Sequence, residues 1–323
     1  MCLPDFKSGS SPKRGRVGSI PTRLRQKMMS IIPILFFLFS SCLFAEEGVS
    51  IDACIWSRYE YTKIDTNSQS TFALRNAFLG FTRNVNKYVT ARVYLDVGDI
   101  NGKPAYDLYA SLKKEPWEMR LGQFKQFLGL EMLLPPPKLD FIEYSLIGKR
   151  RAPKNPRDVG ILLIFRDKKS ELALACVNGT GKNVLVDENK WKDLSGRLAL
   201  HDKDFILAGN FYYGKIGKED SLKNFERWGI ELAIKTPLEL SSEFLFLRDT
   251  LNGKGFYLAL VYRQKRYQPL FRYDWLEYNK VEEKSYTFGM NILPLKENLK
   301  LGLNFIWQEK ENWRFLTQLQ IAY

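Results

Sequence analysis

Alternation of apolar and polar side chains is the feature that most limits how this chain can fold. Residues 227–235 place Trp228 and Ile230 on one side of an extended strand. They place Arg227 and Glu231 on the other side. A period of two residues predicts β-strands with one apolar and one polar face, and no helical period of comparable length follows residue 45. We therefore predict an all-β chain.

Sixteen segments carry this alternation or a mixed form of it, and most are about ten residues long, which matches a tilted strand crossing a bilayer. The hydrophobic share of 45% is too high for a disordered chain. The predicted strands are 49–61, 72–83, 87–97, 105–113, 117–125, 158–166, 171–179, 194–201, 205–214, 225–235, 238–249, 255–264, 266–278, 283–293, 298–307 and 312–323.

The connections between these strands differ in length at the two ends of the sheet. Links after even-numbered strands are short, whereas several links after odd-numbered strands are longer, namely 62–71, 126–157, 180–193 and 215–224. Long external loops and short periplasmic turns are typical of outer-membrane barrels. We predict a 16-stranded antiparallel transmembrane β-barrel. A soluble β-sandwich with aromatic residues in its core is the alternative, and it does not explain the loop pattern.

Residues 1–45 precede the strands and have a different composition. Residues 28–45 carry no charge, basic residues come before them, and Ala45 offers a cleavage point. This layout predicts a secretory signal peptide with an extended basic n-region. An uncleaved anchor is less favoured because of Pro33 and a short apolar core, and a lipid attachment site at Cys42 has poor flanking residues.

The barrel domain is therefore expected to span residues 46–323. Parts of it resemble the phosphate-selective porin O and P family, whose G-Q-F-K stretch and following turn are similar to residues 120–131. Residues 157–160 resemble its R-D-x-G strand opening, and 178–197 resemble its N-G-x-G segment. Residues 272–274 and the closing Gln-Leu-Gln-Ile-Ala-Tyr also fit.

This resemblance implies a homotrimeric diffusion channel in the cell outer membrane that prefers anions such as phosphate. The chain departs from the family in two ways that bear on ion preference: Leu128 stands where the family usually has proline, and the chain is short for the family. Tyr323 ends an alternating strand on an aromatic residue, which resembles the signal read by the barrel-assembly machinery. The expected partners are this machinery, outer-membrane lipid and small anionic solutes.

The segment 126–157 is the longest predicted loop, and loops of such length are usually functional or disordered. Its first part is apolar and its second part is basic, so we predict a constriction loop that folds inward and narrows the lumen. Positive charges in a narrow pore attract anions. The alternative places these charges on the outer rim, facing lipopolysaccharide or water. The basic residues are Lys149, Arg150, Arg151, Lys154 and Arg157.

In each predicted strand, the residues that alternate with the apolar ones face the lumen, and several of these residues are charged. Among them we predict Arg92, Arg120 and Arg272 as pore-lining and anion-binding residues. Arg272 and Asp274 lie two apart on one face and are expected to pair in part. Other basic candidates are Arg58, Lys113, Arg197, Arg227, Lys235, Lys300 and Arg314. Acidic candidates are Asp52, Glu60, Asp96, Asp107, Glu118 and Glu231.

The sequence predicts no catalytic residue, cofactor or metal site. His201 is the single histidine and falls near the periplasmic end of a strand, where it does not suit a membrane esterase. Basic residues alternate with apolar ones and form no separate face, so nucleic-acid binding is not expected. Two alternatives stay open: a non-selective or nutrient-specific porin, and a barrel with a plugged lumen that acts as an adhesin or surface structural protein.

Overall fold

The computed structural model describes one closed barrel of sixteen antiparallel strands. Each strand pairs with the next along the chain, and the last pairs with the first. The predicted signal peptide and Lys154 lie outside the described residues. The described residues are 48–99, 102–152, 155–184, 186–187, 189–217, 221–249, 252–295, 298–308 and 312–323.

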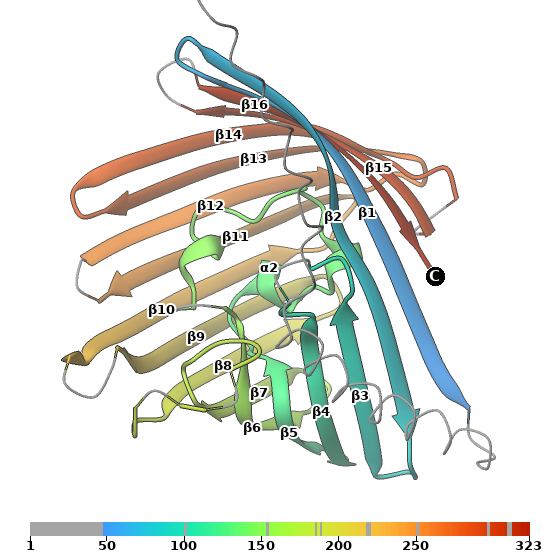
Figure 1. Cartoon of the computed structure of the whole chain (residues 1–323), viewed down its shortest axis with the longest axis vertical. Helices are drawn as coiled ribbons and strands as arrows, with labels where there is room; N and C mark the ends of the chain where they lie inside the picture. The colour runs from blue at the N-terminus through green and yellow to red at the C-terminus, as the bar shows by residue number, and fades with distance from the viewer. Residues whose placement is uncertain are drawn as a thin grey trace, which may run out of the picture. The chain divides into compact units, whose positions relative to one another are not determined.

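Figure 1 shows the order of the strands around the barrel. The strands are β1 (Val49–Ile64), β2 (Asn67–Asn84), β3 (Val89–Asp96), β4 (Ala105–Lys114), β5 (Trp117–Lys125), β6 (Arg157–Arg166), β7 (Ser170–Val177), β8 (Asp193–Asp202), β9 (Phe205–Ile216), β10 (Lys223–Ile234), β11 (Leu238–Arg248), β12 (Asn252–Tyr262), β13 (Tyr267–Tyr278), β14 (Val281–Ile292), β15 (Leu299–Gln308) and β16 (Trp313–Ala322). Between β5 and β6 lie one helical turn, α2 (Leu130–Leu133), and the 3-10 turns η2 (Pro136–Lys138) and η3 (Gly148–Arg150).

All sixteen predicted strands are confirmed, with boundaries that differ by a few residues. The prediction of several long external loops is wrong in two places. β1 and β2 continue to a tight turn at Asp65 and Thr66, because the polar residues of 67–71 pair in register with 60–64. β9 and β10 likewise extend, so their connection runs only from 217 to 222. Polar residues resemble a loop in sequence, but they serve equally well in a strand that leaves the apolar zone.

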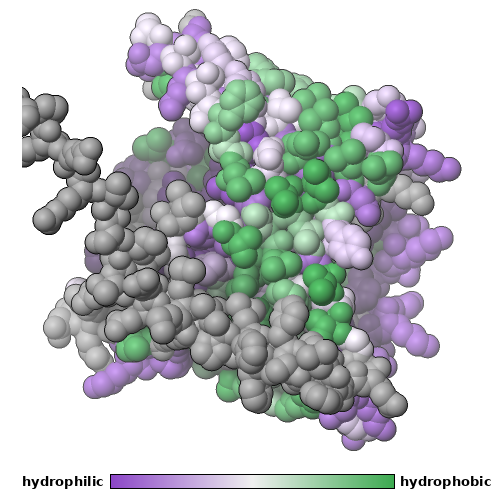
Figure 2. All heavy atoms as spheres, turned by 45° about the vertical axis from the view of Figure 1, so that its right-hand side comes forward, coloured by the Kyte–Doolittle hydropathy of each residue, from purple (hydrophilic) through white to green (hydrophobic). Residues whose placement is uncertain are grey.

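The two faces of each strand have the chemistry that the alternation predicts. Trp228 is 52% exposed on the outer face, whereas Arg227 and Glu231 are buried inside the barrel. Figure 2 shows hydrophobic side chains gathered across the middle of the outer face, with hydrophilic side chains toward its ends. An apolar outer band is what a barrel presents to lipid. Among the described residues, no helix has the length and apolar character needed to cross a membrane.

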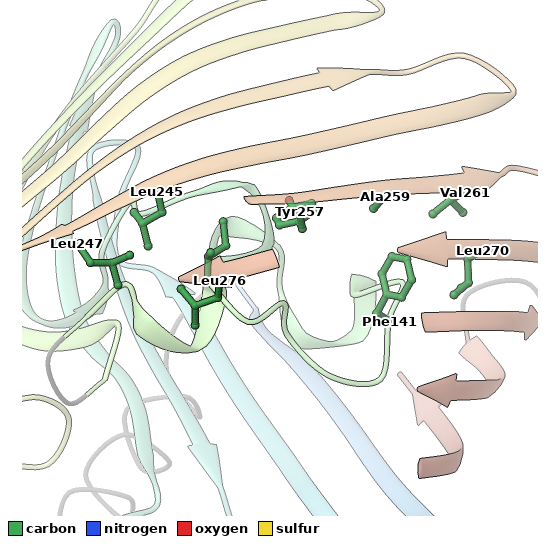
Figure 3. Packing of buried hydrophobic residues seen from close by; sticks show 9 residues of the cluster. Phe141, Leu245, Leu247, Tyr257, Ala259, Val261, Leu270 and Leu276 are labelled. Carbon is green, nitrogen blue, oxygen red and sulfur yellow. The ribbon is translucent and has the colours of Figure 1, made fainter. Parts of the chain in front are cut away.

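The segment between β5 and β6 fills part of the interior of the barrel. Phe141 and Ile147, which belong to the segment between β5 and β6, pack with Leu245, Tyr257 and Leu270 on the inner faces of β11 to β13. Figure 3 shows Phe141 beside Leu270. Apolar side chains of this segment therefore pack on the inner wall of the barrel, where they are removed from water.

Candidate functional site

The segment between β5 and β6, here called the inner loop (residues 126–156), lies within the ring of strands (Figure 1). It begins beside β8, where the hydroxyl of Ser195 donates to Gln126 Oε1 at 2.7 Å. It then runs along the inner wall to the far end of the barrel. The carbonyls of Pro137 and Leu139 accept hydrogen bonds from Lys300 Nζ at 3.1 and 2.7 Å.

The deepest part of the inner loop is held next to the short turns. Asp140 forms a two-pronged ion pair with Arg263, with contacts of 2.5 and 2.9 Å. Arg263 follows β12 in the turn to β13, at the end of the barrel where all the connections are short. Such turns face the periplasm in outer-membrane barrels. The inner loop thus spans most of the height of the lumen.

Glu143 is the main anchor of the returning half of the inner loop. Its carboxylate accepts two hydrogen bonds of 2.9 Å from Arg314, and it contacts Arg58 at 3.4 Å and Lys149 at 3.0 Å. Burial acts to raise the pKa of Glu143, but the hydrogen bonds from Arg314 and the charge of Lys149 outweigh it and hold the pKa at about 2. Glu143 therefore stays ionised at any ordinary pH.

Two of the sequence-predicted anion-binding residues form enclosed ion pairs between the inner loop and the wall. Arg272 is 3% exposed, and it donates to Asp274 at 2.8 Å and to Glu131 at 2.9 Å. Arg151 is 2% exposed and forms an ion pair with Glu243, which is 1% exposed. These arginines join the inner loop to the wall, and their guanidinium groups are already neutralised by carboxylates.

Lys149 and Arg150 lie on the same half of the inner loop. Lys149 is exposed and pairs with Glu143. The guanidinium of Arg150 lies 4.8 Å from the ring centroid of Tyr278, at the end of β13, while its carbonyl accepts a hydrogen bond from Arg227 at 2.8 Å. Among the described residues Arg150 has no carboxylate within ion-pair distance.

A cavity of about 310 Å³ separates the inner loop from the wall of β1 to β5 and the first residue of β6. We call it the basic cavity. It brings together three of the predicted residues, Arg92, Arg120 and Arg157, with Lys125. The rest of its lining consists of Asp52, Tyr94, Asp107, Phe127, Leu133, Pro135, Pro136 and Pro137.

Each arginine of the basic cavity has a carboxylate partner. Arg92 contacts Asp52 at 3.2 Å, and Arg120 contacts Glu118 at 2.6 Å. Arg157 contacts Asp107 at 2.9 Å. The lysine differs from the arginines.

Lys125 Nζ donates to the carbonyl of Leu134 at 2.8 Å and has no carboxylate partner among the described residues. The sequence reasoning did not single out Lys125, although it lies inside the G-Q-F-K stretch that carries the family resemblance. Its position at the last residue of a strand, directly before the longest loop, is the signal that could have identified it.

A second cavity of about 590 Å³ lies on the other side of the inner loop, toward the short turns. We call it the mixed cavity. His201 and Lys235 line it beside paired charges such as Arg197 and Glu171. Five basic side chains are balanced there by five carboxylates: Lys138, Arg197, Lys235, Arg263 and Lys300 against Glu131, Asp140, Glu143, Glu171 and Glu239.

The described part of the chain offers no group of three or more His, Cys, Asp and Glu side chains that could hold a metal ion. Cys54 and Cys176 are free thiols, the first buried and the second exposed. Tyr323 is 88% exposed, and its backbone pairs with Ala53 at the start of the barrel.

Solved structures similar to this chain are outer-membrane proteins. OmpT of Vibrio cholerae, in a trimer form, aligns with a TM-score of 0.67 and 7% identity over 86% of this chain and 100% of its own. OmpF of Salmonella typhi aligns with a TM-score of 0.65 and 10% identity over 86% of this chain and 98% of its own. The outer membrane channel DcaP of Acinetobacter baumannii aligns with a TM-score of 0.65 and 11% identity over 87% of this chain and 98% of its own. At these identities the likeness shows the fold.

No curated protein sequence matches the chain. The model of the phosphate-selective porin O and P family matches residues 49–199, which contain the basic cavity and the inner loop. The resemblance of residues 120–131, 157–160 and 178–197 is thereby confirmed, and family and fold together point to a channel for small solutes rather than to an enzyme. The protein is an outer-membrane β-barrel of the porin type, and its residues 49–199 carry the sequence pattern of the phosphate-selective porin O and P family.

Proposed function

We propose that this porin passes small hydrophilic solutes by passive diffusion and prefers anions. We propose further that anions are selected in the basic cavity. The observation that carries the proposal is the convergence of four basic side chains on about 310 Å³ between the inner loop and β1 to β5. Two carboxylates, Asp52 and Asp107, line the same space. A cavity with low-dielectric walls and an excess of positive charge raises the local concentration of anions.

The predicted residues then divide into two roles. Arg92 and Arg120, which keep partial exposure, contribute to the field of the basic cavity together with Lys125. Arg157 lines the same cavity but is buried and paired with Asp107. Arg151 and Arg272, whose charges are enclosed and paired, hold the inner loop in place.

Lys149 and Arg150 are the remaining described members of the basic run. They lie on the part of the inner loop that returns toward β6, and we propose that they act on anions before these reach the basic cavity. Phosphate specificity would require several unpaired donors that converge on one point. Among the described residues, the basic cavity offers one ammonium group without a carboxylate partner, that of Lys125.

The test is the reversal potential of the channel in a KCl gradient across a planar bilayer, measured for the wild type, Lys125→Glu and Lys203→Glu. Lys203 is an exposed residue of the turn between β8 and β9 and matches the charge change outside the cavity. We expect anion preference in the wild type and in Lys203→Glu. We expect Lys125→Glu to lower the chloride-to-potassium permeability ratio about fivefold, because reversing a charge in a partly wet lumen changes the local energy by about 1 kcal/mol.

Equal selectivity in all three proteins would contradict a selective role for the basic cavity and leave a general porin. Absence of any current would favour a second candidate, a surface structural protein with a plugged lumen. The packing of the inner loop against the wall, through contacts such as that of Asp140 with Arg263, is the observation that supports this candidate.

We also propose a homotrimer in outer-membrane lipid, inserted by the barrel-assembly machinery through the strand that ends at Tyr323. The trimer form of the Vibrio cholerae protein supports the assembly. Apolar side chains on the outer face of β1 and β2, such as Ile55, Phe72 and Leu74, are available to lipid or to a second copy. Chemical crosslinking of the protein in native membranes would measure the number of copies.

A further inference from the structure

We infer that the ligand of the basic cavity is a small organic monoanion with an apolar body, such as a carboxylate on a ring. This inference rests on the proposed anion preference and names the class of solute. It follows from two properties of the cavity: the number of charges without a partner, and the chemistry of the surface opposite them.

The charge count favours one negative charge. The guanidinium groups of Arg92, Arg120 and Arg157 each contact a carboxylate within 3.2 Å. The ammonium of Lys125 contacts a backbone carbonyl, that of Leu134, and no carboxylate among the described residues. A partly exposed ammonium with two donor hydrogens left over can donate them to one carboxylate of a solute.

The surface opposite the charges is apolar. The inner loop contributes Phe127, Leu133 and three consecutive prolines, Pro135 to Pro137, to the lining of the cavity. Tyr94 adds an aromatic ring from β3. Rigid rings and prolines lose little conformational freedom when a solute packs on them, and apolar surface buried between them and the solute favours binding.

Inorganic phosphate fits this cavity less well. A phosphate group is best held by several guanidinium or ammonium groups that are free to donate to it, because it has several acceptor oxygens. The three arginines would first have to leave Asp52, Glu118 and Asp107. Phosphate would also lose hydration against the prolines without any apolar surface to bury in exchange. A monocarboxylate with an apolar body can pair its charge with Lys125 and pack its body on the prolines and rings of the opposite surface.

The experiment compares sodium benzoate, sodium phosphate and sodium chloride in bi-ionic reversal-potential measurements on the full protein. The variants are Lys125→Gln, which removes the unpaired charge, Leu133→Ser, which removes apolar surface, and Lys203→Gln as a matched control. In the wild type we expect benzoate to permeate better than phosphate. We expect Leu133→Ser to lower benzoate permeability roughly threefold while chloride permeability stays the same. Lys125→Gln should lower the permeability of both benzoate and chloride, and Lys203→Gln should leave both permeabilities unchanged.

Higher permeability of phosphate than of benzoate in the wild type would overturn the inference, and so would an unchanged benzoate permeability in Leu133→Ser. Isothermal titration of benzoate into the purified wild type separates this inference from the anion preference. Binding that is lost in Lys125→Gln, in a channel without charge selectivity, would support the ligand class and contradict the proposed function. Anion preference without benzoate binding would do the reverse.

Discussion

The two sides of the inner loop differ in how their charges are used. On the side of β8 to β16, acidic and basic groups are matched, and pairs such as Arg151 with Glu243 are almost fully enclosed. On the side of β1 to β5, Arg92 and Asp52 form a pair that keeps partial exposure, and Lys125 has no carboxylate partner in the described part of the chain. Charges that are buried and paired hold structure, whereas partly exposed charges remain able to act on a solute.

This comparison also explains why the inner loop stays in the barrel. Its apolar residues Phe141 and Ile147 pack on β11 to β13, and its polar backbone is satisfied by wall side chains such as Lys300 and Asn304. A loop segment inside a barrel must find partners for its backbone groups. The side of β8 to β16 supplies several of these partners, and Lys125 of β5 supplies another at the carbonyl of Leu134.

The largest effect is expected from breaking the most enclosed pair. Arg151→Met leaves the carboxylate of Glu243 buried without its cation, and should lower the free energy of unfolding by about 4 kcal/mol. The double variant Arg151→Met/Glu243→Leu should recover more than half of this loss, because no unpaired charge remains. Thermal unfolding in detergent, followed by gel mobility, measures both. A double variant less stable than the single one would show that the pair itself stabilises the fold.

A smaller effect concerns the pH at which the inner loop is released. The pKa of Glu143 is held at about 2, below the ordinary value for glutamate of about 4.3. Because the folded state lowers this pKa, the stabilisation is complete above about pH 4.3 and is lost as the pH falls through about 2. Glu143→Gln should remove this pH dependence and lower stability at neutral pH by about 2 kcal/mol.

Single-channel conductance and unfolding temperature between neutral pH and about pH 2 would check the role of Glu143. Glu115→Gln is a suitable control, since the side chain of Glu115 is 86% exposed in the turn between β4 and β5. Identical acid profiles for the wild type and Glu143→Gln would exclude Glu143 as the anchor.

The smallest effect is expected at Arg150, whose guanidinium stacks on Tyr278 without a carboxylate partner among the described residues. Arg150→Gln should cost about 0.5 to 1 kcal/mol of stability, the range of an accessible cation–π contact. It should weaken anion preference less than Lys125→Glu does. A larger loss of selectivity at Arg150 than at Lys125 would move the selective step from the basic cavity to the opposite side of the inner loop.

Much of the fold could be predicted because a strand in a barrel wall needs only the correct period. The strand 117–125 was predicted with the boundaries that the structure has, and the two faces around Arg227 and Trp228 follow the alternation. The loop predicted at 62–71 was wrong because pairing, not residue type, decides whether a polar segment extends a hairpin. Part of the candidate site was visible as well, since Arg92, Arg120 and Arg157 share one cavity.

The sequence by itself determined the number of strands, their faces and the one long segment between β5 and β6, because these depend on local period and length. Only the tertiary structure decided which basic residues are free, because an ion pair joins residues far apart in the chain. Arg151 and Lys125 look alike in sequence, yet Glu243 neutralises the first, whereas the second donates to a backbone carbonyl and has no carboxylate partner among the residues that the structure describes. The pairing of charges in the lumen depends on which strands the inner loop contacts, and these contacts join residues that are distant in the sequence.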